Sequence, residues 1–573
     1  MASHSTAHYL LEGLMEAGIE YVFANFGTDH VSIIEELAKW KLAKRRHPEI
    51  VICPHEVVAV HMAGAYAAIT GRGQAVMVHV DSGTANAAMS IHNLFRARLP
   101  VFLMAGKAPF TSHGELPGTR DNYVHYIQDP FDIASLVRPY VKWDYNLQSG
   151  VTTKEVLQRG TAMMNSDPKG PVYLTLPRET LAEEWEESAI RKFPPERFGS
   201  VSLGGTEEPR ARAIAESLMA AENPIAITTY LGRNPQAVAV LEELAKSCAI
   251  LVFESNPSCL NFPHDSPCFG GFAAGKAVTQ ADVGLLLDVD VPWLPSLVHD
   301  NPATRWLQVD VDAIKQDFPM WGFPVDLRVQ GDCATVLQQV LEIVRAEATP
   351  AFHSRIAARM AVLETAREKR RGNLAELAAK PGKLNAISPH YLCAQLNKVI
   401  RADDIVVNEA TRNSQAVANQ IMRTKAHTVF SKAGSGLGSS GGTALGVKLA
   451  RPEARVYLFV GDGGFHFMAP TAVYAVAQLY HLPIFTVVLD NGGWSAVKEA
   501  VLRVYPDGTA AASNEFQALL EGEQRNFAQV GEAFGAHGES VNDPQQLDAA
   551  IERCLAAIDR GQSAVLNVQV SPL

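Results

Sequence analysis

The chain has 573 residues, which predicts more than one domain because single hydrophobic cores rarely grow beyond about 250–300 residues. Its 61 acidic and 50 basic residues give a formal net charge of −11, which argues against a nucleic-acid-binding surface. No stretch offers the ~20 apolar residues of a membrane span, the start lacks a cleavable leader, and the seven cysteines form no C-x-x-C pair. We therefore expect reduced thiols and a cytoplasmic protein without a membrane partner.

The first 188 residues alternate short apolar runs with helical patterns. Residues 19–27, 99–106 and 170–177 are predicted strands, and residues 74–87 combine a strand with a turn that opens a helix. Each strand reads as buried on both faces, which is typical of a parallel sheet covered by crossover helices.

Two further segments repeat this rhythm. Residues 189–350 and 385–573 are predicted to be the second and third domains, and the charged segment 351–384 between them a linker helix. The sequence therefore predicts an α/β fold of three doubly wound domains with parallel sheets, the first formed by residues 1–188.

The strongest motif is VGDGGFHFMAPTAVYAVAQLYHLPIFTVVLDNGGW, residues 460–494. Asp462 and Asn491 are 29 positions apart and follow two predicted strands joined by one crossover helix. Ligands of open α/β sheets bind at the carboxyl ends of such strands. The side-chain oxygens of Asp462 and Asn491 and the carbonyl of Gly493 are hard ligands suited to Mg²⁺ beside a phosphate. Each turn alone is equally well explained as a tight turn, but the pair favours a site.

A second feature is a single carboxylate in an otherwise apolar segment. Glu56 lies within IVICPHEVVAVHMAGAYAA, residues 50–68, which reads as a buried strand leading into a packed helix. A buried charge costs several kcal/mol unless it is paired or hydrogen-bonded. A partly exposed acid at a helix N-terminus is the structural alternative, because the helix dipole favours acids there.

These features resemble the thiamine diphosphate (ThDP) enzymes, whose motif is GDG followed about thirty residues later by N-N or D-N. Three segments most resemble the sequences of benzoylformate decarboxylase and acetolactate synthase-like proteins: LVRPYVKWDY, GPVYLTLP and SGLGSSGGTALGVKLARPEARVYLFVGDG. The resemblance covers the whole chain and implies pyrimidine-binding, central and diphosphate-binding domains. It implies ThDP and Mg²⁺ as cofactors; a flavin (FAD) is neither indicated nor excluded.

The resemblance also implies residue roles. Glu56 would hydrogen-bond a pyrimidine nitrogen of ThDP, Ser435 would offer its carbonyl to the cofactor's amino group, and Leu437 would wedge under the cofactor. Asp462, Asn491 and Gly493 would hold the metal. The remaining cofactor contacts implied are Gly83, Asn86, Thr411, Arg412, Gly461, Gly463 and Gly464.

His79, four residues before Gly83, matches a histidine of benzoylformate decarboxylases, whereas acetolactate synthases carry a small residue there. An imidazole of near-neutral pKa can protonate a carbanion and help to release an aldehyde; a turn cap is the structural alternative. Thr28 takes the place of a catalytic serine. The residues implied in the substrate pocket are Thr28, His30, His79, Trp293, Trp494, Ala496, Val497 and Ala500.

The chain departs from the family in places. Ala65-Tyr66 replaces the usual glycine-tyrosine after the catalytic glutamate, and a second catalytic histidine has no clear counterpart, with Trp293 nearest and His299 further on. The chain is therefore expected to act on a 2-oxo acid or related carbonyl compound by non-oxidative decarboxylation, C–C bond formation or both.

Other readings are an acetolactate synthase-like carboligase or C–C lyase, a nicotinamide-dependent oxidoreductase, and a non-catalytic relative. An oxidoreductase would need G-x-G-x-x-G directly after a strand, and a non-catalytic relative would have lost Glu56, Asp462 or Asn491. The resemblance further implies a homodimer or homotetramer with shared active sites, in which the first domain of one chain faces the third domain of its partner.

Overall fold

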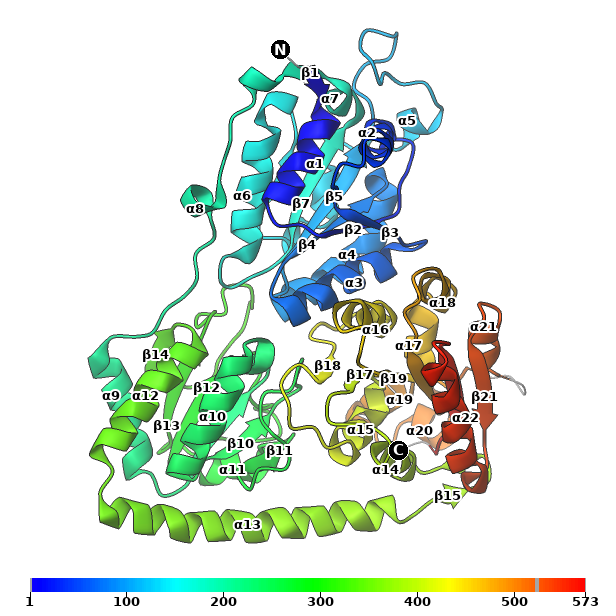
Figure 1. Cartoon of the computed structure of the whole chain (residues 1–573). Coiled ribbons are helices and arrows are strands. Elements are labelled where there is room, and N and C mark those ends of the chain that lie inside the picture. Colours follow the sequence, from blue (N-terminus) through cyan, green and yellow to red (C-terminus); the bar gives the residue numbers. More distant parts are fainter. Residues whose placement is uncertain (1–2, 521–524, 572–573) are drawn as a thin grey trace.

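Three six-stranded parallel sheets follow one another along the chain, with helices packed on their faces (Figure 1). The computed structural model describes residues 3–520 and 525–571. This arrangement confirms the predicted α/β class with three parallel-sheet domains. The boundaries at residues 188, 350 and 384 stay predictions.

The first sheet has the strand order β3-β2-β4-β5-β7-β6. Its central strands are apolar and almost fully buried, as expected for strands covered on both faces. A two-stranded ribbon, β1 with β8, ties the start of the chain to the end of this domain. The elements are β1 (Ser3–Ser5), α1 (Thr6–Glu16), β2 (Tyr21–Ala24), α2 (Val31–Leu42), β3 (Glu49–Ile52), α3 (Glu56–Thr70), β4 (Gln74–Val78), α4 (Val80–Ala97), β5 (Val101–Lys107), α5 (Val124–Ile127), β6 (Asp144–Asn146), α6 (Thr153–Asn165), β7 (Val172–Pro177), α7 (Arg178–Ala182) and β8 (Glu184–Glu186).

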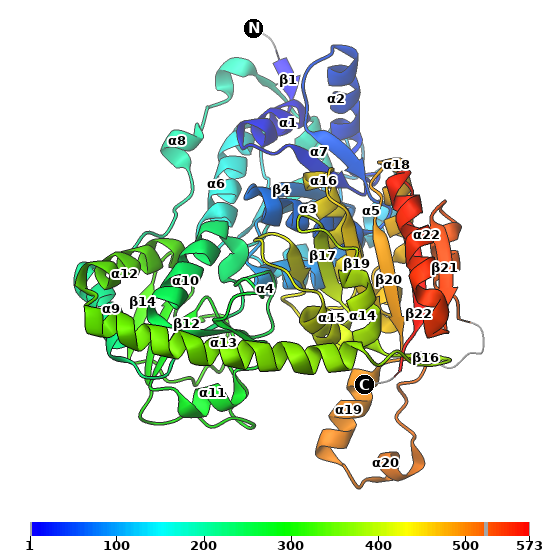
Figure 2. The same cartoon turned by 60° about the horizontal axis from the view of Figure 1, so that its bottom comes forward.

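The second sheet has the order β11-β10-β9-β12-β13-β14, so the chain reverses direction across the sheet between β9 and β12. The long helix α13 then runs along the underside of the molecule to the third domain (Figure 2). The elements are α8 (Pro195–Phe198), α9 (Glu208–Ala220), β9 (Pro224–Thr228), α10 (Pro235–Cys248), β10 (Leu251–Glu254), β11 (Phe269–Gly271), α11 (Gly275–Gln280), β12 (Val283–Leu287), β13 (Arg305–Asp310), β14 (Leu327–Gln330), α12 (Cys333–Glu347) and α13 (Pro350–Ala378).

The third sheet has the order β18-β17-β19-β20-β22-β21 and matches the first in topology. A short ribbon, β15 with β16, precedes it. The elements are β15 (Gly382–Lys383), β16 (Ala386–Ile387), α14 (Pro389–Asn397), β17 (Ile405–Glu409), α15 (Ser414–Gln420), β18 (Val429–Ser431), α16 (Ser439–Ala450), β19 (Val456–Gly461), α17 (Asp462–Phe467), α18 (Pro470–Leu479), β20 (Phe485–Asp490), α19 (Ser495–Val504), α20 (Thr509–Ser513), α21 (Ala528–Glu532), β21 (His537–Val541), α22 (Leu547–Asp559) and β22 (Ala564–Gln569).

One predicted element is broken in two. The sequence predicts a single crossover helix after Gly463, but α17 ends at Phe467 and α18 begins at Pro470. Ala469 between them has a left-handed backbone with φ of 52°. The residue before a proline disfavours the α conformation, so the helix cannot continue through this point.

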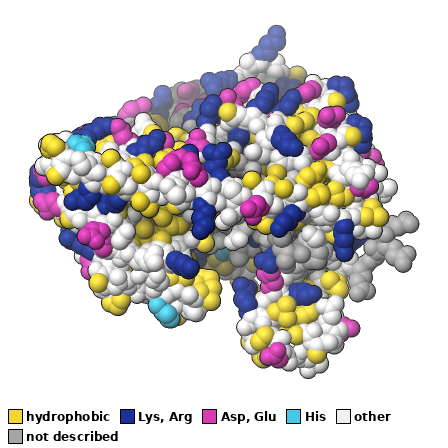
Figure 3. Space-filling model, turned by 90° about the horizontal axis from the view of Figure 1, so that it is seen from below, with side chains coloured by type: hydrophobic (Ala, Val, Ile, Leu, Met, Phe, Trp, Pro, Cys, Tyr) yellow, Lys and Arg dark blue, Asp and Glu magenta, His cyan; other side chains and the backbone are white. Residues whose placement is uncertain are grey.

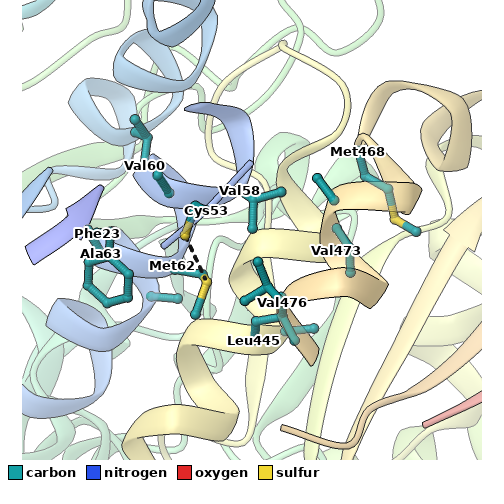
Figure 4. Packing of buried hydrophobic residues seen from close by; sticks show 14 of the residues in the cluster. Phe23, Cys53, Val58, Val60, Met62, Ala63, Leu445, Met468, Val473 and Val476 are labelled. Carbon is teal, nitrogen blue, oxygen red and sulfur yellow. Dashed lines mark hydrogen bonds between the residues drawn. The ribbon is translucent and has the colours of Figure 1, made fainter. Parts of the chain in front are cut away.

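The first and third domains share one hydrophobic core. α3 packs along α16, and Val58 and Met62 of α3 meet Leu445, Val473 and Val476 of the third domain (Figure 4). A fully buried aliphatic side chain contributes about 1.5–3 kcal/mol. This shared core fixes how the two domains sit relative to each other.

A buried ionic cluster joins the first domain to the second. Arg98, directly after α4, forms a two-point ion pair with Asp290 at 2.7 and 3.2 Å and lies 3.9 Å over the ring of Tyr230. Lys315, fully buried, donates to Asp290, Asp310 and the Tyr230 hydroxyl at 3.1, 2.7 and 2.6 Å. The charged groups of this cluster are thus all paired and hydrogen-bonded, which offsets the cost of removing them from water.

Within the described residues, no helix is both long enough and apolar enough to cross a membrane.

Candidate active site

Glu56 is the first residue of α3 and is 4% exposed. Asn25 donates from Nδ2 to its Oε1 at 2.9 Å, and Asn86 donates from Nδ2 to its Oε2 at 3.2 Å. Gly83, one turn before Asn86, packs so closely that a Cβ there would lie 3.3 Å from Oε1. A carboxylate has about four acceptor positions, so two neutral amides orient Glu56 and still leave it able to accept or hold a proton.

His79 lies between β4 and α4. Its Nδ1 is hydrogen-bonded to the carboxylate of Asp29, and its Nε2 is 3.0 Å from Oε1 of Gln128. Both ring nitrogens thus face acceptors, an arrangement that suits the protonated ring. The hydrogen bond that His79 donates to Asp29 is the largest influence and raises the pKa of His79.

The Asp29–His79 pair depends on two close backbone approaches. A Cβ at Gly27 would lie 2.0 Å from Nδ1 of His79, and one at Gly106 would lie 1.3 Å from Oδ2 of Asp29. Asp29 is 1% exposed and its Oδ2 accepts no hydrogen bond from the described residues. Burial alone would raise the pKa of Asp29, but the bond to His79 leaves it below its ordinary value.

The two neighbours of Asp29 differ in exposure. Thr28 is exposed, and its hydroxyl lies 3.3 Å from Nε2 of His125. His30 is fully buried, accepts the amide of Gly27 at 3.0 Å, and has a pKa lowered by burial. Thr28 is therefore available to a substrate, whereas His30 packs as a neutral ring beneath the turn.

Two carboxylates meet at the ends of β19 and β20. Asp462 accepts the amides of Gly463 at 2.9 Å and Gly492 at 3.1 Å, and Asp490 also accepts Gly492 at 3.2 Å. Burial, and then the charge of Asp490, raise the pKa of Asp462 to about 7. Arg525 donates to Oδ1 of Asp490 at 3.1 Å, while Oδ2 is buried without a partner among the described residues. This acidic cluster is incompletely neutralised and suits an added cation.

The turn after β20 is tightly constrained. Gly493 has φ of 147°, and a Cβ there would lie 2.3 Å from the carbonyl oxygen of Ala518, so only glycine fits. The Asn491 side chain accepts the Gly493 amide at 3.4 Å, and the Gly493 carbonyl accepts the amide of Ser495 at 3.1 Å. Trp494 follows and covers Gly463, where a Cβ would be 2.6 Å from its Nε1. The three expected metal ligands therefore come from two adjacent turns.

The predicted diphosphate contacts lie at neighbouring strand ends. Thr411 follows β17 with a left-handed backbone, φ of 48°, and Arg412 forms an ion pair with Glu499 of α19. Gly461 precedes α17, and Gly464 lies within its first turn. An N-terminal helix turn presents free amides, which bind phosphate.

Ser435 and Leu437 lie on the turn between β18 and α16. Ser435 is exposed and Leu437 half-buried. Glu409, at the end of β17, accepts the amides of Gly438 and Ser440 at 3.0 Å each and so caps α16. The turn that carries Ser435 and Leu437 therefore leads into a helix, α16, whose N-terminus is fixed by Glu409.

The expected pocket residues of the second and third domains are not gathered together. Trp293 is packed against Trp306 and Phe323, with ring centroids 4.7 and 5.2 Å apart, in the core of the second domain. This placement favours a packing role, and we leave Trp293 out of the pocket proposed below. The residues Ala496, Val497 and Ala500 lie exposed on α19.

The residues present fit a diphosphate–metal group. The donor set offers a carboxylate, an amide oxygen and a carbonyl, which are ligands that Mg²⁺ accepts. The buried oxygen of Asp490 without a partner among the described residues lies beside this donor set and suits a bound cation.

Comparison with known families decides the affiliation. The models described as "Thiamine pyrophosphate enzyme, N-terminal TPP binding domain" and "C-terminal TPP binding domain" match residues 4–136 and 411–568. The chain belongs to the thiamine pyrophosphate enzyme family. Its third domain is thus a ThDP-binding domain, and its first domain the matching N-terminal one.

Individual relatives agree in length and architecture. The chain is 23% identical to benzoylformate decarboxylase of Pseudomonas aeruginosa, over 97% of this chain and 96% of that protein. It is 22% identical to the acetolactate synthase isozyme 3 large subunit of Escherichia coli, over 99% and 95%. The solved ThDP-dependent 4-hydroxybenzoylformate decarboxylase of Rhodococcus jostii RHA1 has the same fold, with a TM-score of 0.79, 20% identity and 99% coverage of both chains.

Sequence reasoning missed several residues that the structure places at the site. Asn25, Asp29, Gln128, Glu409 and Asp490 each hydrogen-bond an expected site residue or its turn. Asp490 directly precedes Asn491 in the motif, so its carboxylate could have been predicted at the site from its position at the same strand end. Gln128 is 49 residues from His79, so no local spacing points to it.

Proposed function

We propose that this enzyme uses ThDP and Mg²⁺ to decarboxylate a 2-oxo acid without oxidation and to release an aldehyde. The observation that carries the proposal is the Asp29–His79 pair, in which a carboxylate favours the protonated imidazole at the end of α4 that also carries Asn86, the partner of Glu56. A positioned acid is what aldehyde release requires, because a carbanion must be protonated.

Each residue has a role that follows from its contacts. Asp462, Asn491 and Gly493 would hold Mg²⁺ with the diphosphate, while amides near Gly461 and the residues Thr411 and Arg412 would face the phosphates. Glu56 would hold and move a proton at the pyrimidine nitrogen, with Asn25 and Asn86 fixing its orientation. Bound ThDP supplies a carbon nucleophile and stores the electron pair that CO₂ leaves behind.

Two side chains would act on the substrate. His79 would donate a proton from Nε2 to the product carbon once Gln128 yields its place, and Asp29 would stabilise the charged ring. Thr28, exposed beside this pair, would orient the substrate carboxylate through its hydroxyl. Trp494 would form one wall, since it covers the glycine turn at the metal.

C–C bond formation is the second candidate. Its support is the similarity to acetolactate synthase and the sequence itself, in which the second catalytic histidine of benzoylformate decarboxylases has no clear counterpart. In a site with one proton donor fewer, an aldehyde or a second oxo acid would compete with the proton for the carbanion.

The test is a panel of 2-oxo acids that includes benzoylformate and pyruvate, with CO₂ and products measured with and without added aldehyde. The decarboxylase proposal predicts CO₂ and the matching aldehyde in equal amounts. Hydroxyketone as the main product would favour the carboligase. Absence of CO₂ from every acid, in protein shown to contain ThDP by thiochrome fluorescence, would overturn both.

We also propose a cytoplasmic homodimer or tetramer of dimers. The seven cysteines are all free and buried, which suits a reducing compartment.

A further inference from the structure

One side chain of the first domain binds the turn of residues 434–438 in the third domain, which the family resemblance implies to contact the cofactor. Asn93, on α4, is 3% exposed. Its Nδ2 donates to the carbonyl of Gly436 at 3.0 Å, and its Oδ1 accepts the amide of Gly436 at 3.1 Å. A single carboxamide thus pairs with both backbone groups of one residue, which fixes the position and the tilt of that peptide.

A neighbouring histidine sets which way the carboxamide of Asn93 points. His61 lies 2.8 Å from the carbonyl of Val57 through Nδ1, so Nδ1 must carry the proton and Nε2 must accept. Nδ2 of Asn93 lies 3.3 Å from that Nε2. Burial lowers the pKa of His61 to about 4, so the ring stays neutral and keeps this acceptor. The orientation that binds Gly436 is therefore the one His61 dictates.

The turn is shaped to meet Asn93. A Cβ at Gly434 would lie 2.3 Å from Oδ1 of Asn93, and one at Gly436 would lie 2.2 Å from Sδ of Met89. A side chain at 434 would meet the Asn93 side chain and its Cα, and so would displace the turn from α4, whereas one at 436 would require Met89 to move. The contact is thus built from both sides, by an asparagine on the helix and by two glycines on the turn.

Ser435 lies between those two glycines, and Leu437 follows directly. Glu409 accepts the Gly438 amide, so Asn93 and Glu409 fix the residues on either side of Leu437, while Ser435 directly precedes the peptide that Asn93 fixes. A displacement of about 1 Å near a reacting group can slow a reaction about a hundredfold.

We infer that Asn93 is a positioning residue, which sets Ser435 and Leu437 so that the bound cofactor is held in its reactive conformation. This inference rests on the proposed function. It also means that α4 carries both Asn86, which orients Glu56, and Asn93, which binds the turn of residues 434–438 in the third domain.

The test compares Asn93→Ala with Ser90→Ala. Ser90 lies one turn earlier on α4, is fully buried, and its hydroxyl has no partner among the described residues, so it controls for truncation of a buried polar side chain. Two quantities are measured in holoenzyme: the dissociation constant of ThDP, and the rate of C2–H exchange of bound ThDP by quenched-flow NMR. A third is deuterium uptake by peptides spanning residues 431–440 in apoprotein.

For Asn93→Ala we expect a C2–H exchange rate at least about tenfold lower, the factor that a change of about 1.4 kcal/mol produces. The dissociation constant should stay within about threefold, because the diphosphate ligands are untouched. Deuterium uptake at residues 431–440 should rise, and Ser90→Ala should leave all three quantities at wild-type values.

Unchanged exchange and unchanged deuterium uptake in a folded Asn93→Ala protein that contains ThDP would overturn the inference. Should Asn93→Ala fail to fold, Asn93→Ser keeps the polarity of the site and is held to the same outcomes. Failure of the proposed function looks different, since wild-type protein would then bind no ThDP or show no accelerated exchange.

Discussion

At the scale of single residues, the proposed site consists of buried polar side chains that are hydrogen-bonded to neutral or charged partners. Glu56 is kept between two amides, whereas His79 is tied to a carboxylate. Glu56 therefore has neutral hydrogen-bond partners, whereas His79 has a charged one, which favours the protonated form of its ring.

Asp29→Asn should shift the pH dependence of catalysis. His79 has a raised pKa, so its protonated form persists above the ordinary histidine value of about 6.5, and activity should fall as pH rises through the raised pKa. Removing the Asp29 charge should move the alkaline limb of kcat/KM towards lower pH. Asp81→Asn is the control, because Asp81 is the smallest of the influences on His79. An alkaline limb that stays in place in Asp29→Asn would contradict the assignment of His79.

The same pair makes stability pH-dependent. The pKa of His79 is raised on folding and that of Asp29 is lowered, so the pair stabilises the fold fully between about pH 3.8 and 6.5. The contribution is lost as pH rises through the raised pKa of His79, and as pH falls through the lowered pKa of Asp29.

At the scale of elements, the ends of neighbouring strands supply the chemistry. The turns after β19 and β20 contribute Asp462 and Asn491, and those after β2 and β4 contribute Asp29 and His79. α4 links these regions, since it begins beside His79, presents Asn86 and Asn93, and ends beside Arg98. Relative placement of the three domains is thereby fixed along one helix.

Asp462→Ala should release the cofactor, and Asn491→Ala should do so to a lesser extent. Both remove an oxygen ligand from adjacent strand ends, and loss of a charged ligand costs more than loss of a neutral one. The measurement is ThDP content after desalting, with and without added Mg²⁺, and the exposed acid of Asp507→Ala is the control. Full ThDP content in desalted Asp462→Ala would rule out this metal site.

Arg98→Ala should lower stability by about 1.5–3 kcal/mol, the range for hydrogen bonds to charged groups, because Asp290 loses the two-point pair with Arg98 but keeps its bond to Lys315. Thermal unfolding followed by fluorescence is the measurement. Arg138→Ala is the matched control, since Arg138 also forms a two-point ion pair with an aspartate, Asp132, but at the surface. Equal effects of the two substitutions would show that the interdomain cluster contributes no more than a surface pair.

The sequence patterns predict the elements better than their contacts. The strands that end at Gly461 and Asp490 follow from apolar runs bounded by glycine turns, and Glu56 stands out as a charge in an apolar segment. The Asp29–His79 pair spans 50 residues and the Asn93–Gly436 contact spans 343, so only the folded chain brings them together. Trp293 was expected at the pocket because it stands nearest to the place of the family's second catalytic histidine, and the sequence alone does not show that its ring packs against Trp306 and Phe323.

At the scale of the whole molecule, two apolar surfaces lie exposed near the two halves of the site. One belongs to the segment around α5, which also supplies Gln128 to His79; its exposed residues are Tyr123, Tyr126, Ile127 and Phe131. The other belongs to the lobe of α19 and α20, which projects from the body and follows the metal turn (Figure 2). Seen from below, this lobe displays apolar side chains (Figure 3). Val497, Val504 and Tyr505, on or directly after α19, are exposed. Surfaces of this kind mark sites of association.

A hybrid experiment tests whether each site is shared between two chains. Glu56→Ala and Asp462→Ala chains, inactive separately, should regain about a quarter of wild-type activity when unfolded and refolded together in equal amounts. Half of the dimers formed at random are hybrids, and each has one intact site of two. Mass measurement by light scattering should give a dimer or tetramer. A fully active monomer, or no recovery in hybrids of confirmed composition, would contradict sharing.

C2–H exchange of bound ThDP in Glu56→Ala protein tests the central claim most directly. Glu56 is proposed to move the proton that activates the cofactor, whereas the metal turn is proposed to bind it. The account predicts that Glu56→Ala retains ThDP and Mg²⁺ but exchanges the C2 proton about 10²–10⁴-fold more slowly than wild type, the range of a positioned acid or base. Equal exchange rates in the two proteins, with ThDP bound to both, would contradict it.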